Sequence, residues 1–255
     1  MSYLEKLSFQ LYSSRNFPPL EAQLETLAAI GYRQVEPYGG LYGDPKALAN
    51  ALAHAHLNAP SGHVSLAAVR DEPDRVAEIA RLIGMRYVVV PYLVPDERPK
   101  DSEGWRKIAR TLDGLAKDYA KRGLELAWHN HDFEFIPLAD GGVPMRLMLD
   151  TAPELKLELD IAWAVKGGVD PVAWLERYQG RVVACHIKDI AIEDTKEEDG
   201  WADVGHGRLD WSVLAPAAVK AGAQLLVVEH DAPSDFERCA RRSYATVATW
   251  EGLAA

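Results

Sequence analysis

The chain has 255 residues, of which 48% are hydrophobic and 26% are charged, a composition typical of a globular protein with a sizeable core. Its net charge of −10 argues against nucleic-acid or anionic-membrane partners, because phosphate groups are bound by clustered Lys and Arg. The two cysteines, Cys185 and Cys239, form no disulfide framework and indicate a reducing compartment. No apolar run approaches the roughly 18 residues that span a bilayer, and no signal-peptide pattern is present, so a cytoplasmic location is expected.

Eight short runs of β-forming residues alternate with segments of helical period along the chain. Alternating apolar positions indicate strands, and apolar residues spaced three and four apart indicate helices. The expected strands are 6–12, 34–36, 59–66, 87–91, 124–131, 155–160, 181–188 and 225–229. The expected helices, several begun by proline or aspartate and ended by glycine, are 20–30, 46–57, 76–83, 102–122, 143–151, 171–178, 211–221 and 235–250.

This alternation predicts the architecture. Eight strands and eight helices in about 250 residues match the (β/α)8 barrel in number and length, so the expected fold class is α/β, a single-domain TIM barrel over residues 1–255. An open doubly wound sheet is the competing architecture, but no Gly-x-Gly-x-x-Gly turn follows the first strand. No linker of Pro, Gly or Ser divides the chain, and the acidic segment 191–207 is expected to be a loop over the site.

The segment 155–189 contains the strongest signal of a site. Two runs of period two end on Asp160 and near His186, and Asp170-Pro171 begins a helix between them. Strand, helix and strand in about 35 residues is the length of one right-handed βαβ unit. Its parallel strands would bring Asp160 and His186 to the same end of the sheet, where a carboxylate beside an imidazole indicates a bound ligand.

Polar residues fall on one face of nearly every expected strand. If Asp160 and His186 face inward, alternation assigns the inward positions of the other strands. They are Ser8, Gln10, Tyr12, Gln34, Glu36, Ser61, His63, Ala127, His129, His131, Glu158, Lys188, Val227 and Glu229. Buried polar groups are costly unless they are paired or ligated, so this pattern predicts a metal or a ligand. Glu158, deeper in the barrel, is expected to be a scaffold partner for Lys or Arg and to stay outside the site.

The metal ligands expected from this pattern are Glu134, Asp160, His186 and Glu229. The fourth ligand comes from the fifth strand or the residues after it: Glu134 is favoured, and His129 or His131 is the alternative. Oxygen donors with one imidazole suit Mn²⁺, Mg²⁺ or Co²⁺, and Zn²⁺ or Fe²⁺ also fit. The expected cofactor is therefore a divalent metal ion.

Eight stretches of the sequence carry a family resemblance. They are 8–12, 29–36, 61–63, 128–135 (Trp-His-Asn-His-Asp-Phe-Glu-Phe), 159–163, 186–189 (His-Ile-Lys-Asp), 204–207 and 228–231 (Val-Glu-His-Asp). In this order they resemble the sugar phosphate isomerase/epimerase superfamily, the xylose isomerase-like barrels. The resemblance implies a divalent ion held by Glu, Asp, His and Glu from strands five to eight, which Asp160, His186 and Glu229 match. Where many members have Glu-Pro on strand five, this chain has His129-Asn130.

These residues allow a base to remove a proton next to a carbonyl, with a metal stabilising the enediolate that forms. The expected catalytic residues are Glu134, Glu229, His131, His63 and Lys188. The expected substrate contacts are Gln10, Glu36, His129 and Trp163. Lys188 has a structural alternative, a salt bridge to Asp160 or Glu229.

The function expected first is a metal-dependent sugar isomerase or epimerase, because the resemblance joins the acid–base residues to a metal site. The family also contains lyases, so a dehydratase acting on ketosugars or 3-keto-glycosides is the alternative. An endonuclease-like phosphodiesterase is less favoured because the chain is acidic, and a non-catalytic sugar-binding barrel is the third alternative. The expected partner is a small sugar, without nucleic acid or membrane, and a homo-oligomer stays open.

Overall fold

The computed structural model describes residues 2–193 and 197–252. The barrel strands are β1 (Leu7–Gln10), β2 (Gln34–Glu36), β3 (Ser61–His63), β4 (Tyr87–Val90), β5 (Glu125–His129), β6 (Lys156–Asp160), β7 (Val182–Ile187) and β10 (Leu225–Val228). The helices are α1 (Leu20–Ile30), α2 (Pro45–His54), α3 (Leu66–Asp71), α4 (Pro73–Ile83), α5 (Ser102–Lys121), α6 (Pro144–Thr151), α7 (Ile161–Lys166), α8 (Pro171–Arg177), α9 (Trp211–Ala221) and α10 (Phe236–Ala248).

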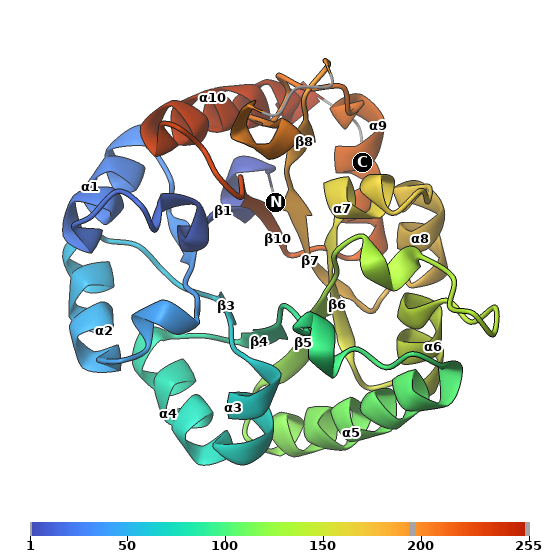
Figure 1. Ribbon diagram of the computed structural model, residues 1–255. Coiled ribbons are helices and arrows are strands. Elements are labelled where there is room, and N and C mark those ends of the chain that lie inside the picture. The colour runs from blue at the N-terminus through green and yellow to red at the C-terminus, as the bar shows by residue number, and fades with distance from the viewer. Residues whose placement is uncertain (1, 194–196, 253–255) are drawn as a thin grey trace.

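The eight barrel strands form one parallel sheet in the order β2-β1-β10-β7-β6-β5-β4-β3. Between β2 and β3, the ends of this order, Val35 N–H donates to Asn58 O and His63 N–H donates to Pro37 O, each at 2.9 Å. These bonds bring the first and last strands together, so the barrel is nearly closed. Figure 1 looks into it, with the strands inside a ring of helices. The prediction of a single-domain TIM barrel is confirmed.

The structure contains local elements that the sequence pattern did not predict. Helices α3 and α7 are short, and a two-stranded antiparallel hairpin pairs β8 (Asp189–Ile190), just before the segment expected to be a loop, with β9 (Trp201–Ala202) within that segment. Residues 194–196 of that segment lie outside the described part. Helix α7 follows β6 directly because Asp160 Oδ1 accepts from Trp163 N–H at 2.7 Å, as an N-cap. Asp160 thus caps a helix as well as facing the barrel interior.

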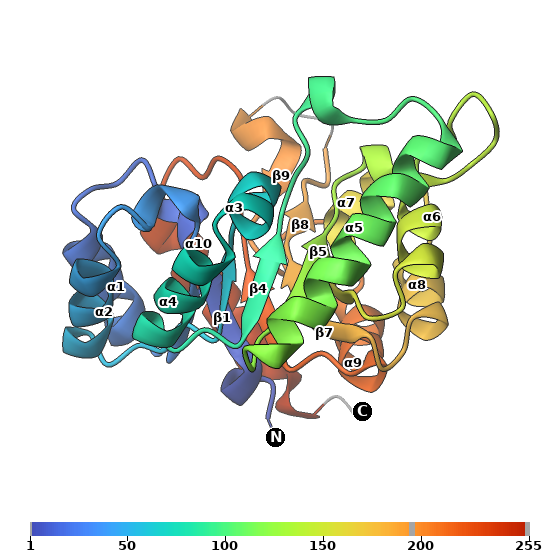
Figure 2. The same ribbon diagram turned by 90° about the horizontal axis from the view of Figure 1, so that it is seen from below.

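The two ends of the barrel differ in polarity. At the end where the strands begin, an apolar cluster inside the sheet contains Tyr87, Val89, Ala127, Val183, Ala184, Leu225 and Val227. The first and last described residues lie at this end, at the bottom of Figure 2, and the β8–β9 hairpin lies at the other end. The apolar side chains on the outer faces of the strands pack against the helices. None of the helices in residues 2–193 and 197–252 is long and apolar enough to cross a membrane.

Candidate active site

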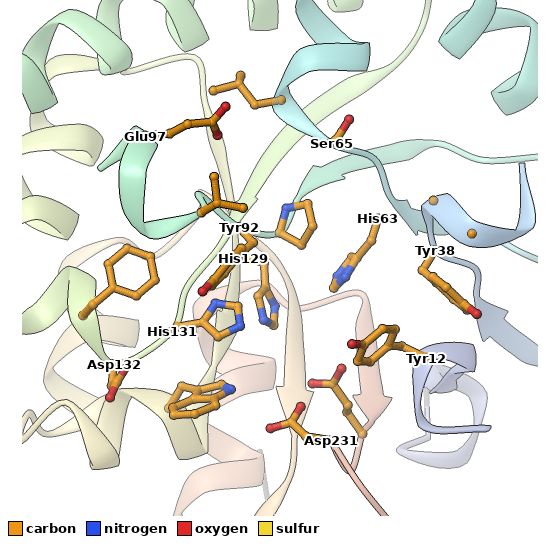
Figure 3. Close-up of a pocket in the computed structure, with 18 of the residues that line it drawn as sticks. Tyr12, Tyr38, His63, Ser65, Tyr92, Glu97, His129, His131, Asp132 and Asp231 are labelled. Atoms are coloured by element: carbon orange, nitrogen blue, oxygen red, sulfur yellow. The ribbon is translucent and has the colours of Figure 1, made fainter. Parts of the chain in front are cut away.

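A cavity of about 990 Å³ opens at the carboxyl ends of the strands, where chemistry in this architecture is found. It is lined by residues from the strand ends and the loops that follow them, including Tyr12, Tyr38, His63, Tyr92, His129, His131, Trp163, Glu229 and Asp231. In Figure 3 the imidazoles of His63, His129 and His131 point into the same space. The inward positions predicted on β3, β5 and β10 therefore meet at this cavity.

Strand register explains why the polar side chains converge. Across neighbouring strands, Asp160 pairs with His186, His129 with Glu158, and Gln10 with Glu36. Paired residues on parallel strands point to the same face, so each pair enters the barrel together. Because β1 ends at Gln10, Tyr12 lies in the 3-10 turn Leu11–Ser14 rather than on the strand, and its ring is 40% exposed.

Four buried side chains contact one another inside the barrel: Glu36, His63, Glu158 and His186. We call these four residues the histidine–glutamate ring. His63 Nε2 lies 3.0 Å from Glu36 Oε1 and 2.8 Å from Glu158 Oε2. His186 Nε2 lies 2.8 Å and 3.2 Å from the same two oxygens. The two imidazole rings stack with an angle of 8° between their planes.

A second set of charges lies at the level of Asp160, two residues further along β6 than Glu158. The lysine cluster, as we call it, comprises Asp160, Lys188, Glu229 and Asp231. Lys188 Nζ lies 2.8 Å from Glu229 Oε2, 2.9 Å from Asp231 Oδ1 and 3.3 Å from Asp160 Oδ2. Lys188 is fully buried, and its ammonium neutralises one fully buried carboxylate, Asp160, and two that line the cavity, Glu229 and Asp231. The salt bridges expected as the structural role of Lys188 are present.

His186 connects the two sets. Its Nε2 faces the histidine–glutamate ring, and its Nδ1 lies 3.0 Å from Glu229 Oε2. Burial lowers the pKa of His186, but the carboxylates of Glu158 and Glu229 outweigh burial and raise it well above its usual value. The imidazole is thus held between carboxylates on both of its nitrogens.

The neighbouring charges divide the histidines into two kinds. Burial lowers the pKa of His63, but Glu36 and Glu158 raise it to about 9. Burial, with help from the Lys188 ammonium, lowers the pKa of His131 to about 3. His131 is therefore a neutral imidazole at the cavity wall, and its buried Nδ1 has no hydrogen-bond partner among the described residues.

The buried carboxylates also differ in pKa, again because of the charges beside them. Burial raises the pKa of Asp160 to about 6, although Lys188 opposes it. For Glu158, burial and Glu36 raise the pKa, but His186 and His129 prevail and lower it to about 2. For Glu229, burial is outweighed by Lys188 and His186, which hold its pKa well below the usual range. Glu229 is therefore an ionised carboxylate at the cavity wall.

The structure does not bring Glu134 into the group around Asp160. Its buried carboxylate accepts from His131 N–H at 2.8 Å and from Trp128 Nε1 at 3.3 Å. Trp128 belongs to the core between sheet and helices, so Glu134 turns toward that layer rather than into the barrel. The strand-five residue that joins Asp160, His186 and Glu229 is His129, the alternative that the sequence left open.

The expected substrate contacts fall into two groups. His129 and Trp163 line the cavity, whereas Gln10 and Glu36 are fully buried beneath it. Gln10 Nε2 donates to Glu36 Oε1 at 2.8 Å, so Gln10 orients Glu36. The substrate-binding prediction for Trp163 and His129 stays a prediction that the cavity lining supports.

Sequence reasoning missed three residues of this site. Glu158 was placed inward by strand alternation but expected to pair with a basic residue; its partners are histidines. Asp231 lies two residues after Glu229, and this spacing could have indicated a second carboxylate beside Lys188. Asn130 donates to Asp160 O and accepts from Asp160 N–H. Nothing in the sequence pattern distinguished this cross-strand clamp.

The donors around Asp160 fit a divalent metal ion. His129, Asp160, His186 and Glu229, which we call the mouth group, each offer one ligand atom, and these atoms lie within 4.8 Å of one another. Asp160 Oδ2 is buried and accepts no hydrogen bond from the described residues, and the Lys188 ammonium lies 3.3 Å from it. Two imidazoles and two carboxylates are ligands that Mn²⁺, Fe²⁺ and Zn²⁺ accept.

Known proteins resemble the chain in sequence and in fold. It is 26% identical over 204 residues to an inosose dehydratase of Lacticaseibacillus casei, a match that covers 70% of this chain and 66% of the relative, just under two thirds of its length. A sugar phosphate isomerase/epimerase structure from Parabacteroides distasonis has a TM-score of 0.78 at 24% identity, covering 95% of this chain and 93% of the other. A structure described as IOLI protein with a binding zinc atom has a TM-score of 0.73 at 19% identity, covering 96% and 95%.

The family itself follows from a longer match. The family model described as xylose isomerase-like TIM barrel matches residues 24–248. This range begins in α1 and ends with α10, and it contains every residue of the histidine–glutamate ring, the lysine cluster and the mouth group. The chain therefore belongs to the xylose isomerase-like TIM barrel family.

Proposed function

We propose that this chain is an enzyme that removes a proton from the carbon next to the carbonyl of a small polyhydroxylated ketone. The observation that supports this most is the setting of Glu229. Its Oε2 is held by His186 Nδ1 and by Lys188 Nζ, and no described residue donates a hydrogen bond to its Oε1. Because Glu229 also lines the cavity, an ionised carboxylate oxygen is free to accept a proton there.

Other residues have roles that follow from their positions. The Lys188 ammonium lies beside Glu229, where it can stabilise negative charge that develops on a substrate oxygen. His131 and Trp163 line the cavity with ring centroids 5.3 Å apart. The neutral His131 imidazole can hydrogen-bond a hydroxyl, and Trp163 can pack against the apolar face of a sugar or polyol ring.

A divalent metal ion in the mouth group would supply Lewis acidity, polarising a carbonyl and lowering the energy of the neighbouring enediolate. Asp160, His186 and Glu229 were expected to hold it, and we propose His129 as the fourth ligand in place of Glu134. Asn130, bonded to both backbone groups of Asp160, keeps the end of β6 beside β5. Because this donor set accepts several divalent ions, the bound metal is varied in the test of the proposal.

The reaction class depends on where the proton on Glu229 goes next. If it passes to a hydroxyl one carbon further along, the C–O bond breaks, a C=C bond forms and water leaves, so the enzyme is a dehydratase. If it returns to carbon, the enzyme is an isomerase or epimerase. We propose dehydration first, because the relative that matches 70% of this chain is named inosose dehydratase. Sugar isomerisation is the second candidate, since it uses the same first step.

The test is to incubate the chain, loaded in turn with Mn²⁺, Co²⁺, Zn²⁺ or Mg²⁺, with inososes, ketoses and 3-keto-glycosides in deuterated water. Loss of one water from the product, with absorbance of a conjugated ketone, is the expected result. Deuterium at the carbon next to the carbonyl without loss of water would establish isomerisation instead. If every substrate returns without deuterium and without loss of water, under all four metals, the proposal is wrong.

A further inference from the structure

The histidine–glutamate ring has more contacts than hydrogen bonds can explain. An imidazole Nε2 carries at most one proton, so His63 and His186 can donate two hydrogen bonds from these atoms. The ring nevertheless has four N···O distances between 2.8 and 3.2 Å. Four buried donor atoms gathered this closely, with too few protons to bridge them, are what one bound cation would account for.

Charge leads to the same conclusion. The ring contains two buried carboxylates, and in the described ranges neither Glu36 nor Glu158 forms an ion pair with a Lys or an Arg. Neutralising them with protonated imidazoles would stack two positively charged rings whose centroids are 5.2 Å apart. A single divalent cation neutralises both carboxylates and leaves both imidazoles neutral.

We propose that the histidine–glutamate ring binds a divalent transition-metal ion, at a site that shares His186 with the mouth group but takes its other ligands from Glu36, His63 and Glu158. The ligand atoms are Glu36 Oε1, His63 Nε2, Glu158 Oε2 and His186 Nε2. Zn²⁺ bonds to imidazole nitrogen and carboxylate oxygen are roughly 2.0–2.2 Å long, so donor atoms about 3 Å apart can reach one ion.

A fifth donor faces the same place. His129 Nδ1 lies 3.2 Å from Glu158 Oε2. His129, His63, Glu158 and His186 can each direct one ligand atom within 4.8 Å of the others. His129 Nδ1, Glu36 Oε2 and Glu158 Oε1 are also buried atoms with no hydrogen-bond partner among the described residues. Unpartnered polar atoms at this depth are costly, and a metal ligated from His129 removes part of that cost.

The donor set selects the ion. Three imidazoles with two carboxylates favour Zn²⁺, Fe²⁺ or Mn²⁺, whereas Mg²⁺ and Ca²⁺ prefer oxygen alone. His186 belongs to both sites, because its Nε2 faces the ring and its Nδ1 lies 3.0 Å from Glu229 Oε2. The inference does not depend on the proposed reaction, since its readout is the position and number of bound ions.

The experiment is to saturate the metal-free chain with Zn²⁺, count the zinc atoms that remain after desalting, and locate them by anomalous diffraction at the zinc edge. We expect a peak at the centre of the histidine–glutamate ring. It should persist in Asp160→Asn, which changes the mouth group and the lysine cluster but no ring ligand, and in Glu125→Gln, at the opposite end of β5. It should be lost in Glu158→Gln and in Glu36→Gln, with at least about a 100-fold weaker affinity for zinc.

Two results would overturn the inference. One is a wild-type crystal, saturated with zinc, that has no anomalous peak in the ring, because the ring is then a hydrogen-bonded network. The other is a ring peak that keeps its occupancy in both Glu158→Gln and Glu36→Gln. The wild-type map decides the question even if a variant does not fold, and a thermal melt of each variant checks folding. A zinc peak in the mouth group alone would support the metal site that the family resemblance implies, and it would contradict a metal ion in the histidine–glutamate ring.

Discussion

The histidine–glutamate ring and the lysine cluster are two buried polar sets in the same barrel, one layer apart on β6, and they balance their charges differently. In the lysine cluster the Lys188 ammonium lies within 3.3 Å of three carboxylates. In the histidine–glutamate ring the carboxylates of Glu36 and Glu158 face imidazoles and the amide of Gln10. The first set contains its own permanent cation, and the second does not.

Because only the lysine cluster contains a permanent cation, the two sets are expected to have different roles. A buried carboxylate needs a positive partner, because desolvation of an unpaired charge costs several kcal/mol. Lys188 provides this partner regardless of metal, so the lysine cluster can form in the metal-free chain and keep Glu229 ionised. The ring depends on protons or on a bound ion. We therefore expect substitutions in the lysine cluster to act on catalysis and stability, and substitutions in the ring to act on metal content.

The largest effect is expected for Glu229→Gln, which removes the base and keeps its size. The amide can still accept from Lys188 Nζ but cannot take a proton from carbon, so the rate of deuterium exchange into substrate should fall by about 10²–10⁴-fold. Glu125→Gln, which carries the same substitution near the other end of the barrel and pairs with Arg86, is the matched control. A Glu229→Gln variant that keeps more than about a tenth of the wild-type rate would show that another group is the base.

The next effect is expected for Lys188→Met, which removes the cation and leaves its carboxylates buried. Breaking one side of a buried ion pair costs about 3–5 kcal/mol, and unfolding by urea at pH 8 should show a loss of this size. Lys117→Met removes an exposed lysine paired with Asp113, and its effect on the free energy of unfolding should be much smaller, because water and salt screen an exposed pair. Equal losses in the two variants would mean that the carboxylates of the lysine cluster do not need Lys188.

The pH dependence of Lys188→Met tests the same comparison. Burial already raises the pKa of Asp160 to about 6 against Lys188, which lowers it. A carboxyl group whose folded pKa is raised stabilises the fold at low pH, and this stabilisation is lost as the pH rises through the folded pKa. Without Lys188 that pKa rises further, so the destabilisation measured at pH 5 should be smaller than at pH 8. A difference that does not change with pH would exclude this explanation.

The fold could be predicted from the sequence because each local signal agreed with the global pattern. The strand ranges 34–36 and 155–160 differ from β2 and β6 by one residue at most, and proline or aspartate marked the starts of α2 and α8. Helix α7 was missed because Asp160 ends β6 and caps the helix at once, without a turn between them. The β8–β9 hairpin was missed because its strands are two residues long, too short for any periodicity.

The candidate site could be predicted only as far as strand alternation reaches. Alternation determines which residues point inward, and it placed Glu36, His63, Glu158 and His186 on the inner face. It does not determine which inward residues touch, because strand tilt and stagger set the neighbours across the barrel. Glu134 lies beyond β5, where alternation no longer applies, and a 3-10 turn, Phe133–Phe135, turns its carboxylate toward Trp128. No spacing in the sequence indicates that direction.

The smallest effect is expected for Glu134→Gln, outside both sets. Burial raises the pKa of Glu134 to about 8, against the hydrogen bonds that it accepts. Since this value lies above the unfolded pKa near 4.5, the protonated side chain favours the fold at low pH, and that stabilisation is lost as the pH rises through about 8. The variant cannot ionise, so relative to wild type it should gain about 3 kcal/mol between pH 5.5 and pH 8.5 in urea unfolding. Its zinc content should equal that of wild type, and a loss of zinc would return Glu134 to the ligands that the sequence favoured.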